Sequence, residues 1–368
     1  MKSLSLPIPS WSNFSEKIKF KVGIVLLMML SIFGVFSFSL LHFNTTDPFP
    51  DFEIITEERQ KEFGAFTVKV ETGLFLKNFT EFNVVENKFI ADAIIWFEFN
   101  SDEITLDTIG KFSFDNGTII KKSPPDIRIS KNKTRAKYDV RISFKSDLEY
   151  FKFPLEDHRV SLILTNNFVT PQEMFFDVDN SRFNYDSGIF IPNWSIRDVN
   201  TDTGFANPQL DVAQKDKSVS YPQASFILNI QKNGIRKVLV IFLPLFLLVL
   251  LSIFSFLMSL SNTTGRFALA SSALSGLLGY RFVIENMLPR VGYFTVTDTI
   301  YMFLLSIAFS IFVFQLLFTR AALLFLKKAK PDSREMSLGK SRLETINMTV
   351  FMLVVFTLLS STVFSVLL

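Results

Sequence analysis

Two hydrophobic patterns divide the chain. Between residues 44 and 235, apolar side chains recur at every second position in short runs; in the run 89–99 they fill the odd positions, while Asp92 and Glu98 stand among the even ones. A period of two predicts strands with one buried face. Turn signals such as Asn116-Gly117 separate the runs. We therefore expect an antiparallel β-sandwich of about 190 residues, a size that can bury its own core.

The rest of the chain is dominated by long apolar segments. They cover residues 22–41, 238–260, 266–286, 296–326 and 346–368, and each is long enough to cross a bilayer. Basic residues precede the first segment and gather between the last two, in a linker at 327–345. Because basic residues favour the cytoplasmic side, both places are expected in the cytoplasm. The β-sandwich, the loop 287–295 and the carboxyl terminus are then expected outside.

The first apolar segment has two interpretations. It follows Lys17, Lys19 and Lys21, so it is either a secretory signal or a signal anchor. Its 20 residues exceed the usual core of a signal peptide, and no clear cleavage site follows before Asn44. This length favours an uncleaved anchor.

Composition narrows the function. The 368 residues are 48% hydrophobic with a net charge of only +3, which argues against nucleic-acid binding. With no cysteine, disulfides and thiolate metal sites are excluded. The chain lacks the motifs of metal, nucleophile and nucleotide chemistry, and His158 beside Glu156 is interpreted as a loop residue. We expect neither an enzyme nor a bound cofactor or metal.

The segment 266–286 carries one unusual stripe. If helical, it spans roughly 31 Å, and steps of three and four residues pick out positions that are small or polar except for one phenylalanine. A line of this kind suits the wall of a water-filled pore, but small residues also let membrane helices pack closely. This small-residue stripe consists of Ala268, Ser272, Ser275, Gly279, Phe282 and Asn286.

Two stretches resemble the pentameric ligand-gated ion channels, the Cys-loop receptor superfamily in its cysteine-free bacterial form. Residues 150–164, YFKFPLEDHRVSLIL, resemble the family's signature loop of aromatic, proline, aromatic and aspartate, with Leu155 and Glu156 in the last two places. Residues 286–298, NMLPRVGYFTVTD, resemble the Asn-x-Leu-Pro-x-x-x-Tyr-x-Thr junction between the second and third membrane helices. The order of elements and Pro244 in the first pore helix also match.

The chain departs from the family pattern at three places. The tryptophan-proline segment that forms one wall of the family's ligand site is missing, and Gly265 stands where cation-selective members carry a glutamate. Lys232 replaces the arginine before the first pore helix, which keeps the charge but not the bidentate fork. The resemblance therefore leaves the ligand and the ion open.

We expect three parts: residues 1–43 as cytoplasmic amino terminus and signal anchor, 44–235 as an extracytoplasmic β-sandwich, and 236–368 as a four-helix transmembrane bundle. The resemblance implies ligand binding for the second part and a pore for the third, whereas the amino-terminal anchor is a further departure from the family. The resemblance also implies a homopentameric ligand-gated ion channel in the cell membrane, in the bacterial inner membrane given the cysteine-free type. Its partners are an unknown small-molecule ligand at subunit boundaries and the permeating ions. The alternative is a non-conducting membrane sensor with the same fold that signals to a partner.

Particular residues follow from this comparison. The stripe would line the pore, with Phe282 as an apolar gate and Glu285 at the outer mouth, while Arg281 would face a neighbouring helix. Ligand contacts are expected beneath a long loop at 200–220, although the same rings suit a core; they are Phe168, Phe205 and Tyr221. Domain coupling, or else an ordinary set of surface charges and a turn, is assigned to Glu86, Glu156, Lys232 and Pro289.

Overall fold

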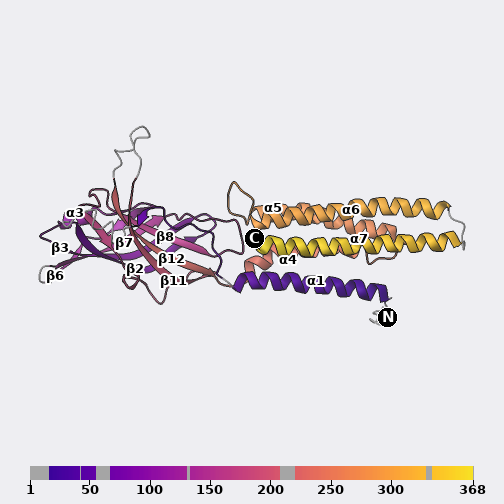
Figure 1. The fold of residues 1–368 in the computed structure, drawn as a ribbon, viewed down its shortest axis with the longest axis horizontal. Coiled ribbons are helices and arrows are strands. Elements are labelled where there is room, and N and C mark those ends of the chain that lie inside the picture. Colours follow the sequence, from indigo (N-terminus) through magenta and orange to yellow (C-terminus); the bar gives the residue numbers. More distant parts are fainter. Residues whose placement is uncertain are drawn as a thin grey trace, which may run out of the picture.

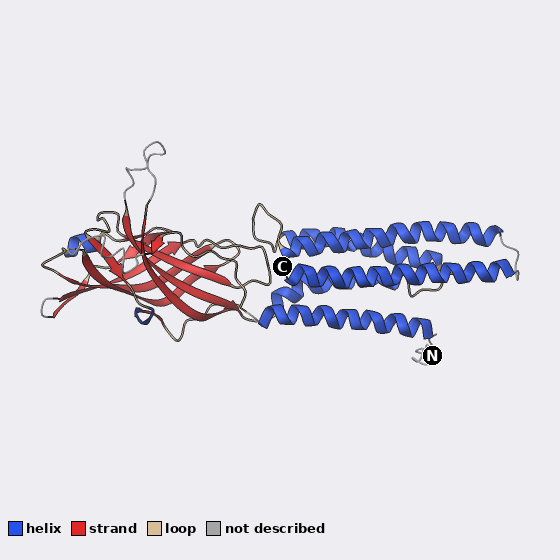
Figure 2. Cartoon of the chain, in the orientation of Figure 1, coloured by secondary structure: helices blue, strands red, loops and turns tan. Residues whose placement is uncertain are grey.

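The chain forms two β-sheets followed by a long helical region, and one further helix precedes the sheets (Figure 1). The computed structural model describes residues 16–41, 43–54, 67–130, 133–207, 220–328 and 334–367. Sheets and helices lie end to end along the long axis of the molecule (Figure 2). The sheets are built from residues between Glu53 and Lys232, and the long helices precede and follow them in the chain.

The first sheet has five strands, in the order β1-β11-β12-β8-β4. Its pairings are antiparallel. Strand β12 lies at its centre and is buried from Pro222 to Ile230, on both faces. The strands are β1 (Glu53–Ile54), β4 (Ser113–Phe114), β8 (His158–Thr165), β11 (Trp194–Ala206) and β12 (Tyr221–Lys232).

The second sheet has seven strands and runs in the order β10-β2-β3-β7-β5, with β6 beside β7 and β9 beside β2. Strands β9 and β10 pair with β2 in parallel, so the expectation of a wholly antiparallel sandwich is wrong at this edge. The strands are β2 (Val68–Asn83), β3 (Lys88–Asn100), β5 (Gly117–Lys122), β6 (Asp126–Ser130), β7 (Lys133–Phe144), β9 (Met174–Asp177) and β10 (Phe183–Tyr185).

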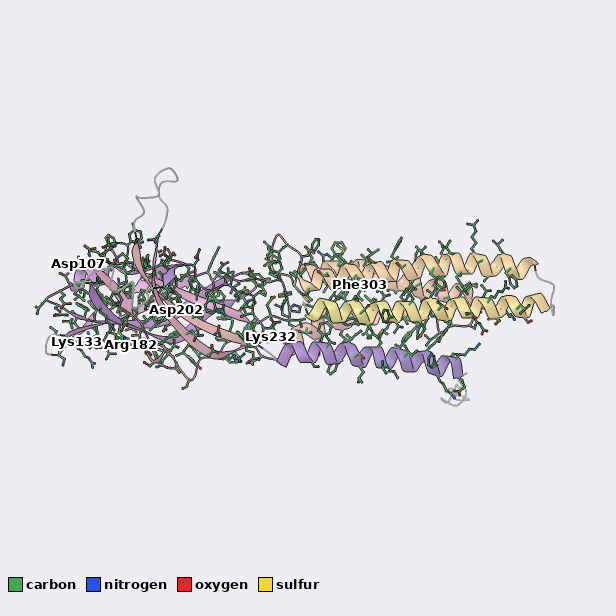
Figure 3. The ribbon with its side chains drawn as sticks, viewed as in Figure 1. Asp107, Lys133, Arg182, Asp202, Lys232 and Phe303 are labelled. Carbon is green, nitrogen blue, oxygen red and sulfur yellow. The ribbon has the colours of Figure 1, made fainter. Side chains whose placement is uncertain are left out.

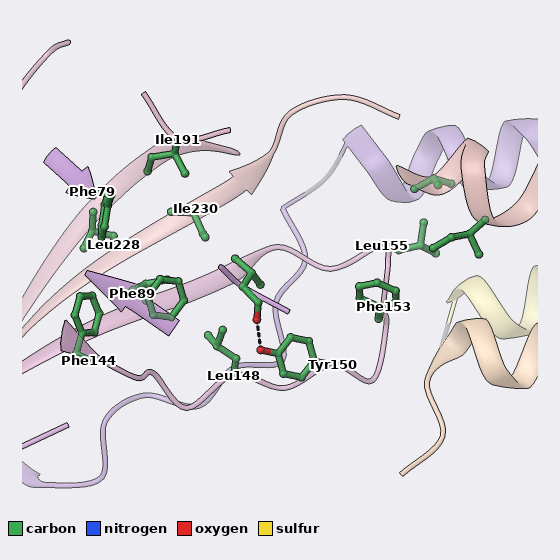
Figure 4. Packing of buried hydrophobic residues seen from close by; sticks show 14 of the residues in the cluster. Phe79, Phe89, Phe144, Leu148, Tyr150, Phe153, Leu155, Ile191, Leu228 and Ile230 are labelled. Carbon is green, nitrogen blue, oxygen red and sulfur yellow. Dashed lines mark hydrogen bonds between the residues drawn. The ribbon is translucent and has the colours of Figure 1, made fainter. Parts of the chain in front are cut away.

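The period of two in the sequence is realised in the core. Every second residue of β3 is buried, from Phe89 to Phe99, and β7 repeats the pattern. The rings of Phe89 and Phe144 stack across the two strands with centroids 5.3 Å apart (Figure 4). Aromatic residues bury large areas, so these strands contribute much of the apolar stabilisation. Two short helices, α3 (Leu106–Gly110) and the 3-10 turn η2 (Asn180–Arg182), connect strands.

Strand β11 differs from expectation. The sequence predicts a long loop at 200–220, but residues 200–206 belong to β11. They pair with β12 from Asn200 opposite Ile227 to Ala206 opposite Tyr221. The threonines and asparagine of this stretch are compatible with a half-exposed strand, which a purely hydrophobic criterion misses. The remainder of the predicted loop, 208–219, lies outside the described residues.

Within the described ranges, five helices are long and apolar enough to cross a membrane. Helix α6 ends at Lys328 and α7 begins at Arg334, so residues 327–328 and 334–345 of the predicted linker at 327–345 are helical. The helices are α1 (Glu16–Leu41), α4 (Arg236–Phe254), α5 (Thr263–Glu285), α6 (Val296–Lys328) and α7 (Arg334–Leu367). Pro244 lies inside α4.

Helix α1 packs along the other helices instead of standing apart. The Phe36 ring lies 4.9 Å from that of Phe242 and 6.0 Å from that of Phe246, both in α4. In Figure 1, α1 runs alongside the other helices up to the junction with the sheets, and α6 and α7 extend beyond its amino-terminal end. Whether this helix is retained as an uncleaved anchor stays a prediction.

We expect Gly73→Ala to destabilise the sheets. Gly73 faces Trp96 across β2 and β3, and a Cβ at this position would meet the Trp96 ring at 2.4 Å. Overpacking of this kind costs about 1–3 kcal/mol, so thermal unfolding of the purified variant should begin at a lower temperature. Gly23→Ala in α1 is the control, because nothing lies within 4 Å of its added Cβ. Equal melting of the two variants would contradict this prediction.

Candidate functional site

The two stretches that resemble the channel family lie against each other at the junction of sheets and helices. The Phe151 carbonyl accepts a hydrogen bond from the Val296 N–H at 2.8 Å, and the Phe153 carbonyl accepts one from the Thr297 hydroxyl at 2.8 Å. The rings of Phe151 and Tyr293 stack with centroids 4.2 Å apart. The loop 150–157 is thus bonded to the first turn of α6 and to the segment before it.

The same loop is fixed to the sheets from its other side. The Tyr150 hydroxyl donates to the Val84 carbonyl at the end of β2, the bond drawn in Figure 4. The Tyr150 N–H donates to the Tyr293 hydroxyl at 2.8 Å, so one residue touches both regions. Pro289 is buried in the segment between α5 and α6. Side chains and main chain together make this junction a continuous packed surface.

Lys232 and Glu156 meet here. Lys232 ends β12, where Figure 3 shows it beside the helices, and its ammonium donates to the Pro154 carbonyl and, at 3.1 Å, to the Glu156 carbonyl. The Glu156 side chain is 1% exposed, and neither of its oxygens has a hydrogen-bond partner among the described residues. Burial raises the pKa of Glu156 to about 8, although the charge of Lys232 opposes the shift.

Glu86 lies in a turn after an early strand, as predicted, and its coupling role stays a prediction. It is exposed in the turn between β2 and β3, where its N–H donates to Asn83 Oδ1 at 3.1 Å. The hydrogen bonds of the Lys232 ammonium go to carbonyls of the 150–157 loop instead. Of the four coupling residues, Lys232 contacts the main chain of Glu156, and Pro289 is buried in the connection between α5 and α6.

A second buried polar group was not foreseen. His158 begins β8 and is 2% exposed, so the interpretation of it as a loop residue is wrong. Its Nδ1 lies 3.0 Å from Asp47 Oδ2, and the same carboxylate accepts the Arg159 N–H at 2.6 Å. Asp47 belongs to the segment that follows α1, 111 residues before His158. No local sequence pattern signals a pairing over that separation.

The small-residue stripe forms one continuous exposed line on α5. All six of its residues are exposed, and Phe282 at 76% is among the most exposed large side chains. The opposite side of the helix is covered: Ala270, Ala273 and Leu277 are fully buried. Tyr280 fixes the helix rotation by donating to the Val240 carbonyl of α4 at 2.6 Å. Close packing within the described chain therefore does not account for the stripe.

The charged end of α5 is paired. Arg281 Nη1 lies 2.8 Å from Asp298 Oδ1 of α6, and its Nη2 lies 2.6 Å from Glu285 Oε2 one turn along α5. The prediction that Arg281 faces a neighbouring helix is confirmed. Glu285 remains exposed beside the stripe, but its charge is compensated in part by this guanidinium.

A polar cluster, the Arg266 hub, holds the other end of the helices. Arg266 is fully buried; its Nε donates to Gln315 Oε1 of α6 at 3.1 Å and its Nη2 donates to the Asn347 amide oxygen of α7. The Gln315 amide nitrogen in turn donates a hydrogen bond of 2.8 Å to the Ser255 hydroxyl at the end of α4. Lys21 of α1 completes the cluster by donating to the Phe256 carbonyl at 2.8 Å.

The hub was missed from sequence. Gln315 and Asn347 are polar residues inside long apolar segments, and this was the available signal, because such residues are costly in a membrane without partners. The sequence does not indicate that Gln315 and Asn347 contact Arg266. One guanidinium nitrogen, Nη1, has no hydrogen-bond partner among the described residues.

The three predicted ligand residues lie in different surroundings. Phe205 is buried against Phe175, whereas Phe168 is 68% exposed with the Lys111 ammonium 5.5 Å from its ring. Tyr221 opens β12 beside Ala206, half-buried. Within the described ranges, no group of three or more histidine, aspartate or glutamate side chains is placed to hold a metal ion.

No protein-family model matches the chain, and no curated protein matches it.

We expect Glu156→Gln to alter the pH dependence of stability. With the pKa of Glu156 raised from 4.5 to about 8, the folded protein holds a proton that the unfolded chain releases. The stabilisation is complete below 4.5 and is lost as the pH rises through about 8. Thermal unfolding across this range should fall more steeply with pH in the parent than in Glu156→Gln. Glu86→Gln, exposed in its turn, should behave as the parent; parallel curves for the parent and Glu156→Gln would disprove the shift.

We also expect Gln315→Leu to loosen the helical region. The change removes the acceptor of Arg266 Nε, and losing a hydrogen bond to a buried charge costs about 1.5–3 kcal/mol. Gln315→Glu, which keeps an acceptor, should melt closer to the parent. Ser306→Leu, on an exposed position of the same helix, is the control. Melting of Gln315→Leu at the temperature of the control would show that the hub contributes no stability.

Proposed function

We propose that the chain is one subunit of a homopentameric ligand-gated ion channel. The observation that carries this proposal is the small-residue stripe, which is exposed along the full length of α5 while the other side of that helix is buried. Five copies of such a helix around an axis would bring five stripes together and enclose water. The stripe residues other than Phe282 are small or polar and are therefore compatible with hydrated ions.

In this proposal, α4, α5, α6 and α7 form the pore domain and α1 is an additional membrane-spanning helix. The sheets lie outside the cytoplasm, and the amino terminus and the α6–α7 connection lie inside, since the basic residues concentrate there. An unknown small molecule binds between neighbouring sandwiches. Phe168 and Tyr221 are the better candidates for contacting it, because the Phe205 ring is covered by its own chain.

The junction supplies the coupling. A ligand can open a pore only by binding one arrangement of the protein more tightly than the other. The loop 150–157 contacts the start of α6 by two main-chain carbonyls, and the segment before α6 is joined directly to α5. A displacement of the sheets is therefore passed to the end of α5 that carries Phe282 through a short, bonded path.

The gate is assigned to Phe282. Ala268, Ser272 and Gly279 are too small or too polar to exclude water, whereas five phenylalanine rings near the outer end would make an apolar constriction that stops ions by dewetting. Beyond it, Glu285 and Asn286 form a polar outer ring. Because Glu285 is paired with Arg281, we assign neither cation nor anion preference to this ring.

The test is planar-bilayer recording from purified protein whose mass has been measured in detergent. We expect a pentamer, and we expect Phe282→Ala to raise the closed-state leak because the apolar constriction is lost. Phe309→Ala is the matched control, since Phe309 is 55% exposed on α6, away from the stripe. A parent-like leak from Phe282→Ala would rule out this gate. A protein that is not pentameric, or that carries no current in any variant, would support the membrane sensor instead.

A further inference from the structure

A large groove lies where α1 begins and α4 ends, away from the sheets, and α6 and α7 extend beyond these ends (Figure 1). It has a volume of about 890 Å³ and is bounded by the first turns of α1, the segment 256–261 after α4, and the first half of α7. This end is where the long apolar helices give way to charged residues. The groove therefore sits at the level expected for the boundary between lipid and water.

The charges in the groove leave a positive excess. Lys17, Lys21 and Lys340 line it, with Glu16 and Glu344. Glu344 is paired with Lys17 at 2.5 Å, and Glu16 is paired at 3.0 Å with Lys19, which lies outside the lining. Both carboxylates are ion-paired with other lysines, and Glu344 additionally attracts the Lys21 ammonium, while Lys340 has no ion pair among the described residues.

Lys21 is the buried cation of the set. It is 8% exposed, and its ammonium donates to the Phe256 carbonyl, a partner that satisfies one N–H without neutralising the charge. Arg266, fully buried in the adjoining hub, adds a second cation behind the wall. An ammonium kept in so apolar a place favours a negatively charged neighbour.

The other lining residues combine hydroxyl groups with an apolar floor. Ser259, Ser261, Ser341 and Thr345 offer hydrogen-bonding groups, while Leu257 and Met258 are apolar. A second, apolar cavity of about 110 Å³ follows along the same side of α1, between that helix and α4, lined among others by Met28, Ile32, Phe36 and Phe242. A cationic and hydroxyl-rich groove followed by an apolar seam matches a molecule with an anionic head and a hydrocarbon tail.

We propose that this groove binds the headgroup of an anionic phospholipid from the membrane leaflet on that side, with an acyl chain along the seam between α1 and α4. The headgroup phosphate lies against Lys17, Lys21 and Lys340. Phe256 and Asn347 belong both to the lining and to the Arg266 hub, so an occupied groove acts directly on the base of α5. The proposal requires only that the helices cross a membrane, and it stands or falls independently of ion conduction.

The test measures lipids retained by the full-length protein. Parent protein is reconstituted in bilayers of equal parts phosphatidylglycerol and phosphatidylcholine, extracted, and examined by native mass spectrometry. We expect selective retention of phosphatidylglycerol, which Lys17→Gln/Lys340→Gln weakens by about fivefold per lysine. Lys121→Gln/Lys145→Gln removes the same charge from exposed positions in the sheets and should retain lipid as the parent does.

A variant of opposite sign completes the test. Glu344→Gln frees Lys17 and removes a negative charge from the groove, so it should strengthen phosphatidylglycerol retention about fivefold. Equal retention of the two lipids by the parent would overturn the proposal, as would an unchanged preference in both groove variants. Loss of phosphatidylglycerol when inorganic phosphate is added at matched ionic strength would also overturn it, because the groove would then be a site for free phosphate.

Discussion

Main-chain carbonyls of the loop 150–157 are what hold the two regions of this protein together. Four of them, at Phe151, Phe153, Pro154 and Glu156, accept hydrogen bonds from segments distant in sequence: the start of α6 for the first two and the Lys232 ammonium for the others. A loop without internal secondary structure can be buried only if such groups find partners. The loop therefore depends on the helices and the last strand for its shape, and they depend on it for their relative position.

Buried charge appears at both ends of the helical region, with opposite signs and different solutions. At the junction, the Glu156 side chain finds no hydrogen-bond donor in the part of the chain that the structure describes, and its raised pKa lets it become neutral. At the other end, the Arg266 guanidinium donates to the side-chain amides of Gln315 and Asn347, which supply oxygen acceptors in place of a carboxylate. Neutral acceptors spread over several helices tie those helices together more broadly than a single ion pair would. Helix α5 is thus fixed by polar contacts at Arg266 and left exposed along its small-residue stripe.

Much of this architecture could be predicted from periodicity. The alternation in β3 and the five apolar segments identified strands and helices because burial imposes those periods directly. The stripe was found for the same reason, since one face of a helix can be read from spacing alone. Contacts between distant segments could not be read in this way: Asp47 with His158, Arg266 with Gln315, and the covered position of Phe205 arise from tertiary packing. The polar strand at 200–206 was missed because its pairing with β12, not its own hydrophobicity, keeps it extended.

The segment after α1 gives the junction a mechanical property. The chain passes between helices and sheets at two covalent connections, one after Leu41 and one after Lys232. The Asp157 carboxylate links the two connections, because it accepts the Asn44 N–H at 3.0 Å and the Lys232 N–H at 2.8 Å. If these two connections were the only attachments, the sheets could rotate relative to the helices about the line that joins them. The hydrogen bonds of Phe151 and Phe153 form a third attachment outside that line, and they restrict such a rotation. Tilting the sheets against the helices then requires one of the three attachments to break, and the noncovalent attachment is the contact between the loop 150–157 and α6.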